Sequence, residues 1–122
     1  MKILLDSVIL IDHLNGVRAA TDYLAKVHLN AVISVVTRAE VLAGCDPPDA
    51  PPIKQLLDAF PALTLDAAVA DLAATLRRQN KWKLPDAFQA ALAQIHKLQL
   101  ATRNTKDFPP AQYDFALVPY EI

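Results

Sequence analysis

The chain has 122 residues, of which 53% are hydrophobic, so it can bury one substantial core but is too short for two ordinary domains. We therefore expect a single domain over residues 1–122. The formal net charge of −1 at pH 7 excludes a general affinity for polyanions, although a local cluster of basic residues can still provide one. Cys45 is the only cysteine, which excludes a disulfide within the chain and suits a reducing compartment.

The start of the chain does not resemble a secretion signal. Lys2 is followed by the apolar run Ile3–Leu5 and then at once by Asp6, and this run is too short for a signal peptide. No later apolar run approaches the roughly 20 residues that cross a bilayer. We expect a cytoplasmic protein with no membrane partner.

Short apolar runs alternate with helical patterns in the first half of the chain. The predicted elements are a buried strand over residues 2–5, helices over about 8–14 and 17–28, and a strand over 31–33. Ser34 is a favourable N-cap for the next helix, which we expect to end near Gly44.

The second half begins with an irregular connection, because residues 45–52 hold four of the nine prolines. The predicted elements that follow are a helix over about 53–59, a brief strand over 63–65, a helix over about 67–80 capped by Asp66, a helix opened by Pro85 and Asp86 that runs to about Lys97, and strands near 98–102 and 115–118. Strands that alternate with helices predict an α/β fold, with a central, mostly parallel sheet of about four to five short strands flanked by helices on both faces.

Four acidic residues stand where a predicted element ends or presents one face: Asp6, Glu40, Asp86 and Asp107. In an open α/β sheet, ligands bind outside the carboxyl ends of the strands. Carboxylates gathered there repel one another unless a cation or a raised pKa relieves the repulsion. Because oxygen ligands suit Mg²⁺ and Mn²⁺, the four acids predict a site for a hard divalent cation.

Each of these acids also has a structural alternative. Asp6 could simply cap the next helix, Asp86 could complement the helix dipole, and Asp107 could start a turn. Glu40 shares an apolar helical stripe with Val36 and Ala43, where we expect it to be buried or half-buried and in need of neutralisation. Its alternative is a solvated helix residue paired with a neighbouring cation such as Arg38. Among the other acids, Asp66 is interpreted as an N-cap, and Asp12 as a neighbour of the same cleft. Asp22 and Asp71 are interpreted as residues of solvated helix faces, and Asp46 and Asp49 as loop residues.

Other chemistries are disfavoured by residues that the chain lacks. The histidines are isolated, so no zinc motif of the H-E-x-x-H type is present. Cys45 has no histidine near it in sequence, and no G-x-S-x-G elbow exists for a serine nucleophile. With only two glycines, neither a P-loop nor a dinucleotide-binding turn can form.

Four segments of the chain resemble, in order and over nearly the full length, the motifs of the PIN domain, and specifically those of VapC-type toxin ribonucleases of VapBC toxin–antitoxin systems. The segments are residues 4–12 (LLDSVILID), 34–44 (SVVTRAEVLAG), 84–91 (LPDAFQAA) and 102–108 (TRNTKDF). Asp6, Glu40 and Asp86 occupy the acidic positions of the first three motifs. In the fourth, relatives carry an acid at the position of either Asn104 or Asp107, and we prefer Asp107 with Asn104 as a helper.

The resemblance implies an endoribonuclease that hydrolyses RNA phosphodiester bonds with Mg²⁺ or Mn²⁺. It implies that Asp6 and Asp86 hold the principal ion, while Glu40 and Asp107 bind through water, hold a second ion or orient the attacking water. Ser7 and Thr102 would support the carboxylates through hydrogen bonds. One departure from the family is Val8, which stands where the family usually has a polar residue; Asp6 and Ser7 are retained, so we expect metal binding to be retained.

An RNA substrate needs basic residues at the rim of an acidic cleft. The candidates are Arg77, Arg78, Lys81, Lys83, Arg103 and Lys106. Trp82 could stack on a base, or it could pack beneath a solvated helix end. The resemblance also implies a cognate antitoxin, one segment of which lies across the cleft, and a homodimer. The alternative function is a catalytically inactive PIN-fold module that binds a partner.

Overall fold

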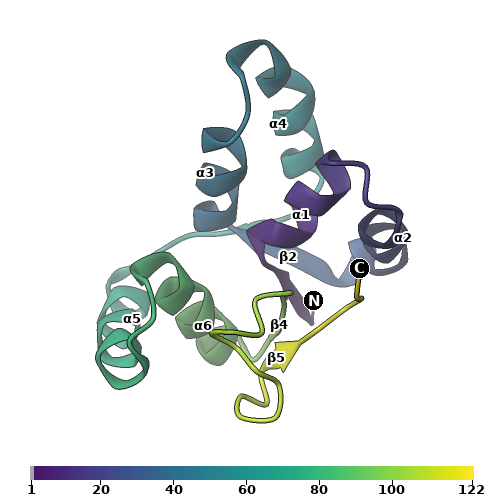
Figure 1. Ribbon diagram of the computed structural model, residues 1–122. Coiled ribbons are helices and arrows are strands. Elements are labelled where there is room, and N and C mark those ends of the chain that lie inside the picture. The colour runs from purple at the N-terminus through teal and green to yellow at the C-terminus, as the bar shows by residue number, and fades with distance from the viewer. Residues whose placement is uncertain (1) are drawn as a thin grey trace.

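A parallel sheet lies at the centre of the computed structural model, which describes residues 2–122 (Figure 1). Its strands are β1 (Ile3–Leu5), β2 (Ala31–Ser34), β3 (Ala62–Leu63), β4 (Gln99–Ala101) and β5 (Ala116–Leu117). Their order is β3-β2-β1-β4-β5, and all four pairings are parallel. The predicted α/β fold with a short-stranded parallel sheet is confirmed.

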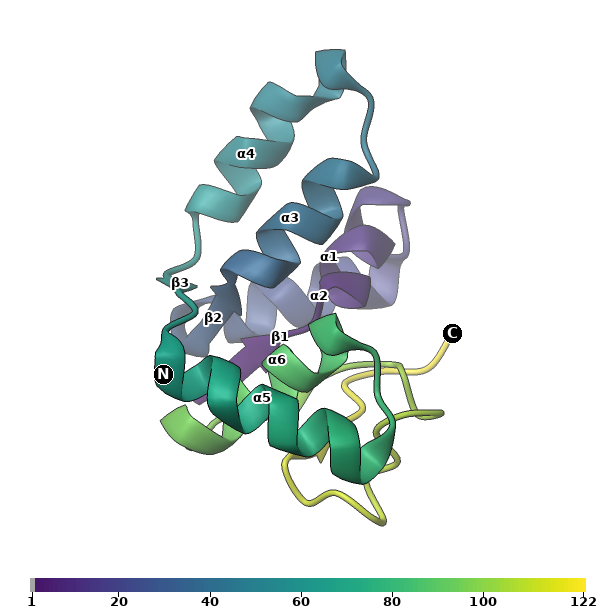
Figure 2. The ribbon, with the colours of Figure 1, turned by 90° about the vertical axis from the view of Figure 1, so that its left-hand side faces the viewer.

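Helices cover both faces of this sheet, as predicted. They are α1 (Ser7–Leu14), α2 (Arg18–Val27), α3 (Val35–Ala43), α4 (Ala50–Asp58), α5 (Ala67–Asn80) and α6 (Leu84–His96), with 3₁₀ turns η1 (His28–Asn30) and η2 (Pro47–Asp49). Figure 2 shows α5 and α6 side by side next to the sheet, with α3 and α4 running together away from it. None of the helices within residues 2–122 combines the length and the apolarity that a membrane span requires.

Alternation along the strands divides the buried residues into two cores. Leu4 of β1 packs with α5 and α6, whereas its neighbour Leu5 packs with α1 to α4. On β4 the same division separates Leu100 from Ala101. Successive strand residues point to opposite faces, so a strand buried on both faces needs apolar residues throughout, as β1 has.

Two helix starts were predicted from their capping residues, and both predictions are confirmed. The Ser34 hydroxyl accepts a hydrogen bond from the Thr37 backbone N–H at 3.1 Å, and α3 ends at Ala43 before Gly44. The Asp66 carboxylate accepts from the Val69 N–H at 2.9 Å at the start of α5. Each cap satisfies a backbone donor that the first helical turn leaves free.

The proline-rich segment differs from its prediction. Instead of an irregular stretch up to residue 52, the chain forms η2 and then α4, which starts at Ala50 with prolines in its first turn. Proline is tolerated there because the first helical N–H groups have no partner within the helix. The prolines were therefore misread as helix breakers. Most strands are also shorter than predicted.

The direction in which successive strands are added to the sheet reverses at its central strand, β1. β2 lies next to β1 and β3 lies next to β2. β4 then lies on the opposite side of β1, and β5 lies next to β4. This topological switch point lies between β1 and β4, where open α/β sheets bind their ligands. Asp6 directly follows β1 and Thr102 directly follows β4, so both lie at the expected place.

Candidate metal-dependent active site

Asp6 is held at the switch point by three hydrogen bonds. Its Oδ2 accepts from the Thr102 hydroxyl at 2.6 Å, and its Oδ1 accepts from the Ser7 N–H at 2.9 Å and from the Gln89 Nε2 at 3.3 Å. Asp6 is only 6% exposed. The bond to Ser7 means that Asp6 also caps α1, so the capping role and a role in the site are compatible.

A buried polar network that the sequence did not reveal surrounds Asp6. Gln89, Ser34 and Thr37 are all buried, and they are joined by hydrogen bonds between their side chains. Ser34 was predicted only as a cap, and Gln89 and Thr37 were not predicted at all. One signal was present: Gln89 is the lone polar residue in the run from Ala87 to Ala93 and lies one helical turn after Asp86.

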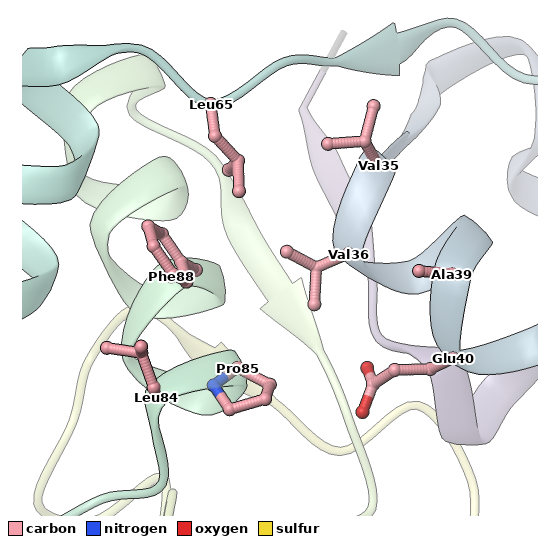
Figure 3. A pocket seen from close by; sticks show the side chains of 8 residues that line it. All are labelled: Val35, Val36, Ala39, Glu40, Leu65, Leu84, Pro85 and Phe88. Carbon is pink, nitrogen blue, oxygen red and sulfur yellow. The ribbon is translucent and has the colours of Figure 1, made fainter. Parts of the chain in front are cut away.

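Glu40 lies on α3 at the edge of an apolar pocket of about 360 Å³. The other residues that line the pocket are Val35, Val36, Ala39, Leu65, Leu84, Pro85 and Phe88. Figure 3 shows the Glu40 carboxyl group pointing across the pocket towards Pro85. The pocket therefore joins the apolar face of α3 to the start of α6, which carries Asp86.

The environment of Glu40 corrects the prediction that it is buried and agrees with the solvated part of its alternative. Glu40 is exposed rather than buried, although its carboxyl group faces the apolar pocket. Its predicted alternative partner, Arg38, instead pairs with Asp58 at 2.8 Å. The pKa of Glu40 is raised, mainly by desolvation and to a smaller extent by the charge of Asp6, while a hydrogen bond with the Ser7 hydroxyl opposes the shift.

Asp86 lies in the first turn of α6 and is partly buried. Its pKa is raised from 3.8 to about 6, first by desolvation and then by the charges of Asp6, Asp107 and Glu40, while the charge of Lys83 lowers it. The dipole of α6 favours a carboxylate at this end. All three of the other predicted acids thus act on Asp86, so the four carboxylates share one electrostatic environment.

Asp107 lies in the loop after β4 and is bound to Asn104. Asn104 Nδ2 donates to Asp107 Oδ2 at 2.9 Å, and the Asp107 N–H donates to Asn104 Oδ1 at 3.3 Å. The Asn104 N–H in turn donates to Thr102 Oγ1 at 3.0 Å. Asn104 thus orients Asp107 and links it through Thr102 to Asp6.

The donor set fits a hard divalent cation, although the side chains are not drawn together around one. Among residues 2–122, no three His, Cys, Asp or Glu side chains are close enough to one another to hold a metal ion. The available donors are carboxylate oxygens, which Mg²⁺ and Mn²⁺ prefer, and their mutual repulsion adds to desolvation in raising the pKa of Asp86. Mg²⁺ keeps several waters and needs only one or two carboxylates, so these acids fit such an ion without a closed cage.

Two of the side chains that were predicted to contact RNA make contacts within the protein. Trp82 is 4% exposed, packs on Phe108 and Tyr113 with ring centroids 4.8 and 5.1 Å away, and donates from Nε1 to the Asp107 carbonyl at 3.0 Å. Base stacking by Trp82 is therefore wrong, and the packed alternative is right. Its indole needs a partner for its N–H when buried, and the loop that carries Asp107 provides one.

Arg103 is committed to an ion pair. Its Nε and Nη2 donate to the two oxygens of Asp12 at 2.6 and 2.8 Å, and the Tyr120 hydroxyl donates to Asp12 Oδ2 at 2.8 Å. Asp12 is 6% exposed, and the hydrogen bond from Arg103 is the main reason why its pKa is lowered. Asp12 thus anchors the segment after β4 and the C-terminal segment to α1, and the Arg103 guanidinium is paired within the protein.

The remaining predicted cations lie on the surface. Arg77, Arg78, Lys81, Lys83 and Lys106 are all exposed. Lys83 lies close enough to the site for its charge to act on Asp86. Arg77 donates to the Trp82 carbonyl at 3.4 Å, so it supports the turn between α5 and α6.

Comparisons with known proteins agree with this geometry. The model of the PIN domain family matches residues 3–111. Ribonuclease VapC10 of Mycobacterium tuberculosis is 36% identical over 114 residues, which cover 88% of this chain and 86% of the relative. A toxin–antitoxin complex from Klebsiella pneumoniae contains a chain that is 37% identical, with a TM-score of 0.91 and coverage of 99% of this chain and 100% of that one.

The chain therefore belongs to the PIN-domain family, and within it to the VapC-type ribonucleases, as its four sequence motifs predicted. FitAcB from Neisseria gonorrhoeae has the same fold, with a TM-score of 0.80 at 24% identity over 98% of this chain and 99% of that one. Metal dependence is typical of the nucleases of this family.

Proposed function

We propose that this protein is the toxin of a type II toxin–antitoxin system, an endoribonuclease that uses Mg²⁺ or Mn²⁺ to hydrolyse RNA phosphodiester bonds. The proposal is carried by the Asp6 carboxylate, which three hydrogen bonds hold at the switch point of the sheet, and by Asp86, whose pKa is raised by burial and then by the charges of Asp6, Asp107 and Glu40. Such a group of like charges is unfavourable for folding and is explained by a cation that binds there. The name of the ribonuclease relative and its 36% identity support the same activity.

The proposed role of each of the four acids follows from its position in the structure. Asp6, fixed by three donors, and Asp86, on the neighbouring helix end, are the proposed ligands of the principal ion. Glu40 and Asp107 would bind through water, hold a second ion or orient the attacking water. A bound divalent ion would acidify a water molecule and stabilise negative charge on the phosphate. Ser7, Thr102 and Asn104 hold the acids in place, and Asn104 assists Asp107 rather than replacing it.

RNA has to approach this acidic site against charge repulsion. The exposed side chains of Lys81, Lys83 and Lys106, with Arg77 and Arg78 on α5, are the cations that would offset it. Lys83 is the best placed of them, because its charge already acts on Asp86.

We further propose a cognate antitoxin as the partner, a segment of which covers the cleft, a homodimer as the oligomeric state and the cytoplasm as the location. The relative from Klebsiella pneumoniae belongs to a toxin–antitoxin complex, which supports the first of these. Light scattering at micromolar concentration tests the dimer, and a monomeric mass would count against it.

RNA cleavage by the purified protein, free of antitoxin, tests the activity. We expect cleavage of a labelled RNA with Mg²⁺ or Mn²⁺, no cleavage with EDTA, and the metal-free level for Asp6→Asn. Asp71→Asn is the matched control, because Asp71 is an exposed acid on α5, and it should cleave like the wild type. Equal cleavage by Asp6→Asn would refute the site, whereas no cleavage of tRNA, rRNA or mRNA with any divalent ion would favour the inactive binding module.

A further inference from the structure

A buried glutamine reaches the Asp6 carboxylate from the helix that carries Asp86. Gln89 is 1% exposed. Its Nε2 lies 3.3 Å from Asp6 Oδ1 and 2.7 Å from Thr37 Oγ1, and its Oε1 accepts from Ser34 Oγ at 2.7 Å. An amide buried this deeply is costly unless its hydrogen bonds are made, and here both ends of the amide have partners.

The hydrogen-bond directions in this network fix which end of the Gln89 amide faces Asp6. The Thr37 hydroxyl has one hydrogen, which it donates to the Leu5 carbonyl at 3.2 Å, so it can only accept from Gln89. The Ser34 hydroxyl accepts from the Thr37 N–H and is free to donate to Gln89 Oε1. The amide nitrogen, which has two hydrogens, is therefore shared between Thr37 and Asp6, and the reverse orientation would set the amide oxygen against the carboxylate.

The three donors to Asp6 come from three different parts of the chain. Ser7 belongs to α1 itself, Thr102 to the segment after β4, and Gln89 to α6. Gln89 is thus the direct link between Asp6 and the helix that presents Asp86 one turn earlier. It restricts rotation of the Asp6 carboxylate and sets its position relative to α6.

We propose that Gln89 is a positioning residue of the nuclease site, which holds the Asp6 carboxylate in the orientation that a divalent cation needs between Asp6 and Asp86. The inference rests on the proposed metal-dependent function, and Gln89 itself is not a ligand. Substitutions of groups that orient metal ligands typically cost about 10- to 100-fold in metal affinity or activity. If Gln89 only filled the core, its substitution would change the stability of the protein but not its metal affinity.

Calorimetric titration with Mn²⁺ separates these two roles. Gln89→Met keeps an unbranched side chain of similar length but donates nothing to Asp6, and we expect Mn²⁺ to bind about 10-fold more weakly or worse. Val69→Ala is the matched control, because Val69 is 2% exposed and packs in the same core as α6 but is not a member of the polar network. It should lose comparable stability to denaturant and keep its Mn²⁺ affinity within about twofold of the wild type.

Equal Mn²⁺ affinities of Gln89→Met and Val69→Ala would overturn the proposal. Should Gln89→Met fail to fold, the same titration is made with Gln89→Leu. The contact is also observable without metal or RNA: Asp6→Ala should shift the NMR resonances of the Gln89 side-chain amide, and unchanged resonances would overturn the proposal.

The outcomes also separate this inference from the proposed activity. If Gln89→Met weakens Mn²⁺ binding but the wild type cleaves no RNA, the positioning role stands and the nuclease assignment fails. If the wild type cleaves RNA and Gln89→Met binds Mn²⁺ as Val69→Ala does, the nuclease assignment stands and the positioning role fails.

Discussion

The carboxylate of Asp86 should destabilise the folded protein at neutral pH when no metal is bound. Folding raises its pKa from 3.8 to about 6, and a difference of about 2 in pKa corresponds to about 3 kcal/mol. Because Asp86 is only partly buried, solvent screening reduces this cost to about 1–2 kcal/mol. Asp86→Asn keeps the shape and removes the charge, so it should make the metal-free protein more stable by that amount while abolishing cleavage, a trade of activity for stability.

The pH dependence of this gain follows from the direction of the pKa change. Between the unfolded value of 3.8 and the folded value of about 6, the folded state binds more protons than the unfolded state, so its stability falls as the pH rises. The cost of the Asp86 charge is therefore fully present above about pH 7 and absent below about pH 4. The stability gain of Asp86→Asn should be largest at pH 7.5 and vanish near pH 4.

Urea denaturation in the presence of EDTA measures this difference across the pH range. Asp71→Asn provides the control, and as an exposed substitution it should change stability by less than about 0.5 kcal/mol at either pH. Added Mn²⁺ should stabilise the wild type and leave Asp86→Asn nearly unchanged, because ligand binding stabilises only a protein that binds it. A variant that is less stable than the wild type at pH 7.5, or that gains equally at pH 4, would refute the argument.

Three further substitutions test the other assignments. Arg103→Ala should lower the free energy of unfolding by about 3 kcal/mol, because it leaves the buried Asp12 carboxylate without its cation. The pKa of Asp12 is lowered in the folded protein, so denaturation curves should show the full loss of stability above about pH 4 and a smaller loss below it. Trp82→Phe should lower the free energy of unfolding by about 1 kcal/mol, because it removes the hydrogen bond to the Asp107 carbonyl. Trp82 is the only tryptophan, and its fluorescence in the wild type should stay unchanged when RNA binds, whereas stacking on a base would change it. Lys83→Ala should weaken RNA binding and lower the salt slope of binding by about 1. Because the Lys83 charge lowers the pKa of Asp86, the same substitution should shift the acidic limb of the pH–rate profile to higher pH. An unchanged salt slope would show that Lys83 does not contact RNA.

Local patterns predicted most of the fold because they depend on short-range physics. The caps at Ser34 and Asp66 bind backbone N–H groups within their own first helical turns, so each start could be read from adjacent residues. The start of α4 was misplaced because a proline reads alike in a loop and in a first helical turn, and only the fold distinguishes them.

The site was predicted less completely, since its finer contacts join distant parts of the chain. The acids were identified from strand and helix ends, yet the hydrogen bond between Gln89 and Asp6 spans 83 residues, and no local pattern reports it. The fate of Arg103 likewise depends on Asp12, 91 residues away. Trp82 was ambiguous in sequence because the residues that bury it, Phe108 and Tyr113, come from the loop beyond β4.

Anomalous diffraction from crystals of the antitoxin-free protein, soaked in Mn²⁺ at a concentration that supports RNA cleavage, tests the central claim most directly. We predict an anomalous peak between the carboxylates of Asp6 and Asp86, which is absent from crystals of Asp86→Asn. An empty site between these two residues, or Mn²⁺ bound only elsewhere on the protein, would contradict the assignment of the four acids as a metal-dependent nuclease centre.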